Sequence, residues 1–154
     1  MFMEHSNFND FVVVDAKDRV VGRVASEVAK QLLDGKKVAI VNAELSYMTG
    51  SRIAIVRRYR TRLNLQEKEN PEHSPYWPRR PDMLVRRIVR GMLPYHKKPS
   101  GKTAYRNLRV FMGVPSALAK SKMTVIETKE PKKMYVKYLY VKELSELLGY
   151  HDGA

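Results

Sequence analysis

The first forty residues alternate apolar and polar segments in an order that predicts a βαβ unit. The run "FVVVDA" (11–16) is rich in β-branched residues and is typical of a strand buried on both faces. "KKVAIVNA" (36–43) has the same character. Between them, "GRVASEVAKQLLDG" has helical spacing, with one stripe of Val24, Val28 and Leu32, broadened by Ala25, Ala29 and Leu33. Two strands joined by a helix should be parallel, with a right-handed crossover.

The next segment predicts a basic helix followed by a long loop. Ser51 can cap a helix in which Ile53, Val56, Tyr59 or Arg60, and Leu63 follow helical spacing. "QEKENPEHSPYWPRRP" (66–81) is polar, rich in proline and without periodicity. Because this is long for a connection inside a domain, we expect it to be disordered or ordered by a partner.

"PDMLVRRIVRGMLP" (81–94) predicts an amphipathic helix bounded by two prolines. On a wheel of about 100° per residue, an apolar arc of about 140° holds Leu84, Val85, Ile88, Val89 and Met92. An arc of about 100° on the opposite side holds Arg86, Arg87 and Arg90. A face with charge of one sign repels itself unless an anion is near, so this helix can both pack on a core and bind an anion.

The remaining third predicts several shorter elements. We expect a basic loop over 95–107, a third buried strand over 108–113 and a weaker strand over 123–128. A helical turn follows the third strand within 114–122, and "EPKKMYVKYLY" is expected to be extended. "VKELSELLG" predicts a short C-terminal helix that ends at Gly149.

Positive charge is concentrated in the middle of the chain. The 154 residues carry a net charge of +13. Residues 52–109 hold sixteen basic residues, twelve of them arginine, and four acidic ones, a net +12. Solubilising surfaces usually mix both signs, so this excess indicates a polyanionic partner. Arginine suits phosphate better than lysine does, because its planar fork presents several donors.

Other features exclude whole classes of protein. The absence of cysteine excludes disulfides and thiolate metal sites and fits a reducing compartment. The first ten residues lack the pattern of a secretory signal, and no apolar run approaches the roughly 18 residues of a membrane span. We expect a soluble, cytoplasmic protein.

Several motifs together resemble a known family. "VVVDAKDRVVGRVASEVAKQLLDGKKVAIVNAELSYMTG", "RRPDMLVRRIVRGMLP" and "LRVFMGVP" are similar to signatures of the large-subunit ribosomal protein thirteen family. "SPYWPRRP" resembles its archaeal and eukaryotic branch. The resemblance covers about residues 11–115.

The resemblance implies an α/β fold: a three-layer α/β/α domain with a mostly parallel four-stranded sheet and basic extensions. The expected division is an N-terminal extension (1–10), a core (11–115) containing the basic segment 52–109, and a C-terminal extension (116–154). The implied function is a structural part of the large subunit that binds its rRNA, assists assembly and adjoins other large-subunit proteins. No catalysis, cofactor, metal, membrane or small-molecule substrate is implied.

The candidate RNA-binding residues are the basic and aromatic side chains of three segments. They are Arg52, Arg57, Arg58, Arg60, Arg62, Tyr76, Trp77, Arg79, Arg80, Arg86, Arg87, Arg90, His96, Lys97, Lys98, Lys102 and Arg106. The aromatic ones could stack on unpaired bases, although Trp77 could equally pin the long loop to the core.

Three alternatives compete with this interpretation. A dinucleotide site would need G-x-G-x-x-G, and Gly22 stands alone. A nuclease would need paired histidines or clustered carboxylates: His73 and His96 flank the arginine-rich helix, and the acids nearby are Glu67, Glu69, Glu72 and Asp82. An RNA-binding regulator that acts outside the ribosome stays open.

Overall fold

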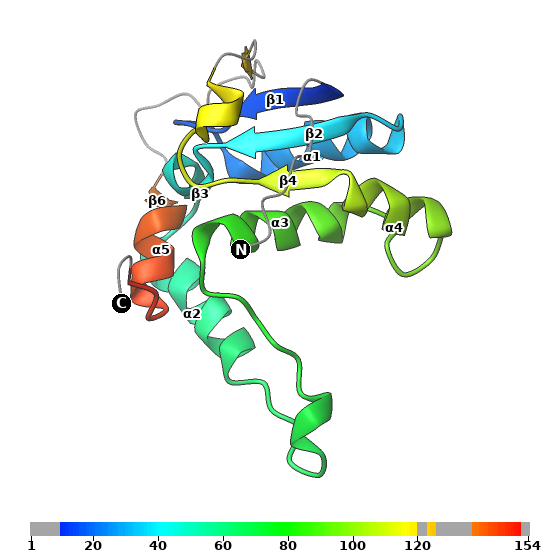
Figure 1. The fold of residues 1–154 in the computed structure, drawn as a ribbon. Coiled ribbons are helices and arrows are strands. Elements are labelled where there is room, and N and C mark those ends of the chain that lie inside the picture. The colour runs from blue at the N-terminus through cyan, green and yellow to red at the C-terminus, as the bar shows by residue number, and fades with distance from the viewer. Residues whose placement is uncertain (1–9, 120–122, 126–136, 152–154) are drawn as a thin grey trace.

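A four-stranded parallel sheet in the order β4-β2-β1-β5 lies at the centre of the fold (Figure 1). Its strands are β1 (Phe11–Asp15), β2 (Lys37–Val41), β4 (Leu108–Val110) and β5 (Met123–Val125). This computed structural model describes residues 10–119, 123–125 and 137–151. The predicted parallel pairing of the first two strands is confirmed, with Val13 opposite Ala39.

The helix α1 (Val21–Leu33) connects β1 to β2 and packs along the sheet. The predicted stripe of Val24, Val28 and Leu32 is buried. Leu33, expected to broaden this stripe, is instead 49% exposed. It is the last residue of the helix, rotated about 100° from Leu32, and its side chain therefore leaves the packed face.

Polar residues close the carboxyl edge of the two central strands. Asn42, which has a left-handed backbone with φ 54°, donates from Nδ2 to Asp15 Oδ1 at 2.9 Å. Glu44 lies in the short turn η2 (Ala43–Leu45) and accepts from the backbone N–H of Gly113 at 3.1 Å. In open α/β sheets this edge commonly binds ligands. Here these side chains are used to join strand ends to neighbouring loops.

Both faces of the sheet bury apolar side chains. On one face, the main core joins the sheet to α1 and to the helices α3 (Pro81–Met92), α4 (Pro99–Arg106) and α5 (Val141–Leu147). On the other, Val13, Ala39 and Val41 pack with Leu118 of the turn η4 (Ser116–Leu118). The domain is therefore α/β with a mostly parallel sheet, which is consistent with the predicted three-layer α/β/α architecture.

A second, two-stranded sheet was not predicted. It pairs β3 (Tyr47–Thr49) with β6 (Tyr138–Tyr140) in antiparallel fashion. Leu139 of β6 and Leu144 of α5 pack into the main core, so the C-terminal part contributes to the same domain. The short C-terminal helix is confirmed, whereas most of the predicted extended stretch 130–140 and nearly all of 1–10 lie outside the described residues. No described helix has the length and apolar character to cross a membrane.

The prediction of a basic loop over 95–107 is wrong, because most of this segment forms the helix α4. Pro99 takes the first turn of this helix, where a proline costs no hydrogen bond. Gly101 faces the backbone of Pro94, and a Cβ at this position would lie 2.5 Å from the Pro94 carbonyl. The glycine therefore allows a close approach between two backbones and does not mark a turn.

The helix α2 (Arg52–Leu63) and the loop after it form an arm that extends away from the sheet (Figure 1). The stripe predicted for α2 is wrong at Ile53, which is 80% exposed, while Ile55 and Tyr59 are buried. The loop has only the turn η3 (Pro71–His73). A hydrogen bond within the loop holds its two sides together: the N–H of Glu67 donates to Ser74 Oγ at 2.9 Å.

Candidate nucleic-acid interface

The arginine-rich helix α3 buries one face against α1 and β4. Leu84, Val85 and Val89 are buried, as the wheel predicts. Ile88 is only half-buried, and Met92, at the C-terminal end of the predicted apolar arc, is 42% exposed. The predicted apolar arc is thus only partly buried: its two edges, Leu84 and Val89, lie in the core, whereas Ile88 and Met92 between them are more exposed.

The three arginines of α3 do not project freely into solvent. Each is half-buried, and its guanidinium carbon lies over an aromatic ring: Arg86 over Tyr105 at 4.8 Å, Arg87 over Trp77 at 3.8 Å and Arg90 over Tyr95 at 5.3 Å. Such contacts contribute about 0.5–2 kcal/mol each, depending on desolvation. They also fix the side chains in position before any partner arrives.

Trp77 connects the long loop to both arginine-bearing helices. Its ring lies 3.8 Å from the guanidinium of Arg87 on α3 and 4.8 Å from that of Arg62 on α2. The Arg87 guanidinium also donates to the backbone carbonyl of Tyr76 at 2.8 Å. These contacts pin the loop to the domain. Tyr76 itself is 85% exposed, so its ring is accessible for stacking.

Burial and positive neighbours shape the electrostatics around Trp77. Burial, and then the neighbouring charge of Arg90, holds the pKa of Arg87 below its ordinary value, with Arg62 adding to this effect. Burial raises the pKa of Tyr59, whereas Arg62 and Arg58 act in the opposite direction. A cluster of guanidinium groups that destabilise one another favours an anion nearby.

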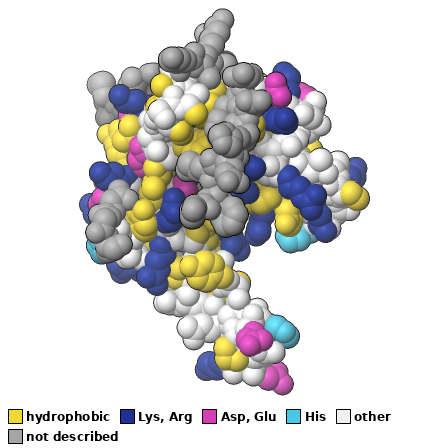
Figure 2. Space-filling model, viewed as in Figure 1, with side chains coloured by type: hydrophobic (Ala, Val, Ile, Leu, Met, Phe, Trp, Pro, Cys, Tyr) yellow, Lys and Arg dark blue, Asp and Glu magenta, His cyan; other side chains and the backbone are white. Residues whose placement is uncertain are grey.

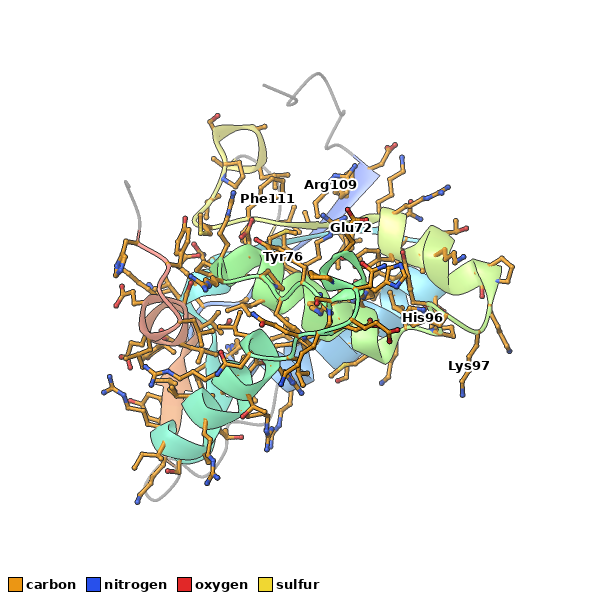
Figure 3. All side chains as sticks on the ribbon, turned by 90° about the horizontal axis from the view of Figure 1, so that it is seen from below. Glu72, Tyr76, His96, Lys97, Arg109 and Phe111 are labelled. Atoms are coloured by element: carbon orange, nitrogen blue, oxygen red, sulfur yellow. The ribbon has the colours of Figure 1, made fainter. Side chains whose placement is uncertain are left out.

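The other candidate cations are exposed. They lie on α2, which carries Arg52, Arg57, Arg58 and Arg60, and on α4 and the turn before it, which carry His96, Lys97, Lys98, Lys102 and Arg106. Figure 2 shows basic side chains around α4 and near the base of the arm. Figure 3 shows His96 and Lys97 together beside α4, with Lys97 pointing away from the domain.

Few of these cations have a carboxylate partner. Within the described part of the chain, the only candidate that forms an ion pair is Arg80, which lies 3.0 Å from Asp82. Arg79 is exposed, and its carbonyl accepts a hydrogen bond from the Ser145 hydroxyl, which joins the end of the loop to α5. The excess charge seen in the sequence is therefore not neutralised by folding.

Arg109 is a basic residue that the sequence interpretation missed. It was assigned to a buried strand, but β4 is an edge strand and Arg109 is exposed. Its guanidinium donates to the Arg106 carbonyl at 3.0 Å, which places it at the end of α4. The position lies inside the basic segment 52–109, so its charge was the available signal.

The nuclease alternative finds no support in the geometry. His73 and His96 are both exposed, and Asp82 is engaged by Arg80. Nowhere in the described ranges do three or more His, Asp or Glu side chains come together as a metal site would need.

Comparison with known proteins decides the family. Residues 9–117 match the family described as ribosomal protein L13. The chain belongs to the ribosomal protein L13 family. The family predicted from the motifs is thereby confirmed, as is the expectation that the chain is a structural protein and not an enzyme.

Curated members of the ribosomal protein L13 family extend this match to almost the whole chain. Each relative bears the name "Large ribosomal subunit protein uL13". The protein of Archaeoglobus fulgidus is 40% identical and covers 92% of this chain and 90% of its own length. Those of Sulfurisphaera tokodaii and Methanococcus maripaludis are 42% and 43% identical; each covers 90% of this chain, and 94% and 97% of their own lengths respectively. These archaeal relatives agree with the predicted branch.

Proposed function

We propose that this protein is a structural component of the large ribosomal subunit in the cytoplasm, where it binds large-subunit rRNA and assists assembly next to other large-subunit proteins. The observation that carries the proposal is a set of exposed cations on α2 and α4 that lack carboxylate partners in the described structure. The names of the curated relatives support the same assignment.

Recognition should depend on phosphates and RNA shape. A-form RNA hides the base edges of its major groove from side chains, whereas its phosphates stay accessible. The arm formed by α2 and its loop, together with α4, offers separated basic surfaces on one α/β domain. Such an arrangement suits folded RNA with several phosphate backbones close together.

The test is binding to transcripts at several salt concentrations. We expect affinity for a large-subunit rRNA transcript to fall steeply with salt, because each neutralised phosphate releases counterions. A small-subunit rRNA transcript of equal length is the control and should bind more weakly. Affinity that is independent of salt, or equal for both transcripts, would refute the proposal.

Sedimentation of cell extract distinguishes the proposed function from that of an RNA-binding regulator that acts outside the ribosome. A ribosomal component travels with large subunits and leaves them only at high salt. A regulator would sediment mainly apart from them.

A further inference from the structure

A groove of about 460 Å³ opens between α2, α3 and the first turn of α1. Buried apolar side chains, among them Val21, Ile55 and Leu84, line it, and Tyr59 and Trp77 add aromatic rings. Its volume lies in the range of about 300–1,000 Å³ that small-molecule-sized ligands fill. A nucleotide is a ligand of this kind.

Two glycines keep this groove open. At Gly22 and at Gly91, an added Cβ would meet no neighbouring atom within 4 Å. Gly91 lies within α3, where glycine costs about 1 kcal/mol of helix stability relative to alanine. No contact inside the described chain requires a glycine there, so the open space is available to an occupant from outside.

The charge of the groove indicates what kind of occupant fits. Arg58, Arg62 and Arg87 are among its lining residues, and no carboxylate is. An apolar floor beside three guanidinium groups matches a nucleotide, whose base has an apolar face and whose phosphate is an anion. An apolar peptide would match the floor but would leave the guanidinium groups uncompensated.

We propose that this groove receives one unstacked nucleotide of the rRNA. The base lies against the apolar floor, next to the guanidinium groups of Arg62 and Arg87 that cover the rings of Tyr59 and Trp77. The phosphate meets Arg58 and Arg62. This inference rests on the proposed rRNA-binding function and adds to it a site that reads an unpaired base.

The first experiment fills the groove from α3. Gly91→Leu should weaken binding to a large-subunit rRNA transcript about ten-fold, because stacking of one base contributes a factor of about 5–150. Gly91→Ala should weaken it about two-fold or less. The salt dependence should fall slightly, because the phosphate that meets Arg58 and Arg62 is lost together with the base. Ser26→Leu, which adds an apolar side chain on the exposed side of α1 outside the groove, should bind as the unaltered protein does.

Gly22→Leu fills the same groove from α1 and should have a similar effect. Circular dichroism checks that each variant is folded; if Gly91→Leu is not, Gly22→Leu carries the test. Base-directed probing with dimethyl sulfate and a carbodiimide gives a second readout. An unpaired base that the unaltered protein protects should become reactive in complexes with either leucine variant.

The outcomes separate this inference from the proposed function. If the unaltered protein binds with steep salt dependence while both leucine variants bind equally well and no base changes reactivity, the groove inference is wrong and the proposed function stands. If the variants bind the transcript normally but fail to enter large subunits, the occupant is a protein and the inference is also wrong. If the unaltered protein does not bind the transcript, both fail.

Discussion

The arginines of α3 and the cations of α2 and α4 carry the same charge in different surroundings. Arg86, Arg87 and Arg90 are half-buried against aromatic rings, whereas residues such as Arg57 and Lys97 are exposed. A guanidinium packed on a ring stabilises the fold and is already ordered before a partner binds. An exposed lysine acts mainly through its charge. One basic segment therefore contains two kinds of cation, and their substitutions should have different consequences.

The largest expected effect comes from Trp77, whose ring contacts Arg87 of α3 and Arg62 of α2. Trp77→Ala should lower the free energy of unfolding by about 2–3 kcal/mol, since it removes a half-buried ring from between α2, α3 and the loop. Urea denaturation measures this value. The neighbouring Tyr76→Ala is the control, and its exposed ring should change stability by less than about 0.5 kcal/mol. Equal losses in both variants would mean that Trp77 does not pin the loop.

A smaller effect, on binding alone, is expected for the exposed cations. Replacing Lys97, Lys98 and Lys102 together by alanine should weaken binding to a large-subunit rRNA transcript about ten-fold at low salt, equivalent to about 1.4 kcal/mol, and should reduce its salt dependence. The free energy of unfolding should be unchanged. A clear loss of stability without a change in salt dependence would contradict the distinction between the two groups.

The smallest effect tests the packed arginines while their charge is kept. Arg86→Lys should lower the free energy of unfolding by about 0.5–1 kcal/mol, because lysine lacks the flat group that lies over Tyr105. Arg57→Lys, on the exposed side of α2, is the matched control and should leave stability unchanged. If the two variants unfold alike, the ring contact of Arg86 contributes nothing measurable.

Much of the fold was predictable because local patterns matched it. The apolar runs of β1 and β2 and the stripe of α1 follow from periodicity, and periodicity reflects burial directly. The prediction failed where a residue type is compatible with more than one local structure. Gly101 and Pro99 suggested a loop, yet in the structure they start a helix and allow it to pack on Pro94. β6 lies in a stretch that was expected to be extended, but β3 has too few residues to show a pattern, so their pairing was not predicted.

By itself, the sequence determined the family, the α/β class and the concentration of positive charge in residues 52–109, because these depend on composition and local order. Only the tertiary structure decided which of the arginines are packed on rings and which are exposed. The physical reason is that the rings reach the arginines of α3 from outside that helix: Tyr105 from α4, Tyr95 from the turn after α3 and Trp77 from the long loop. The same is true of the groove, whose floor and rim come from segments brought together by folding.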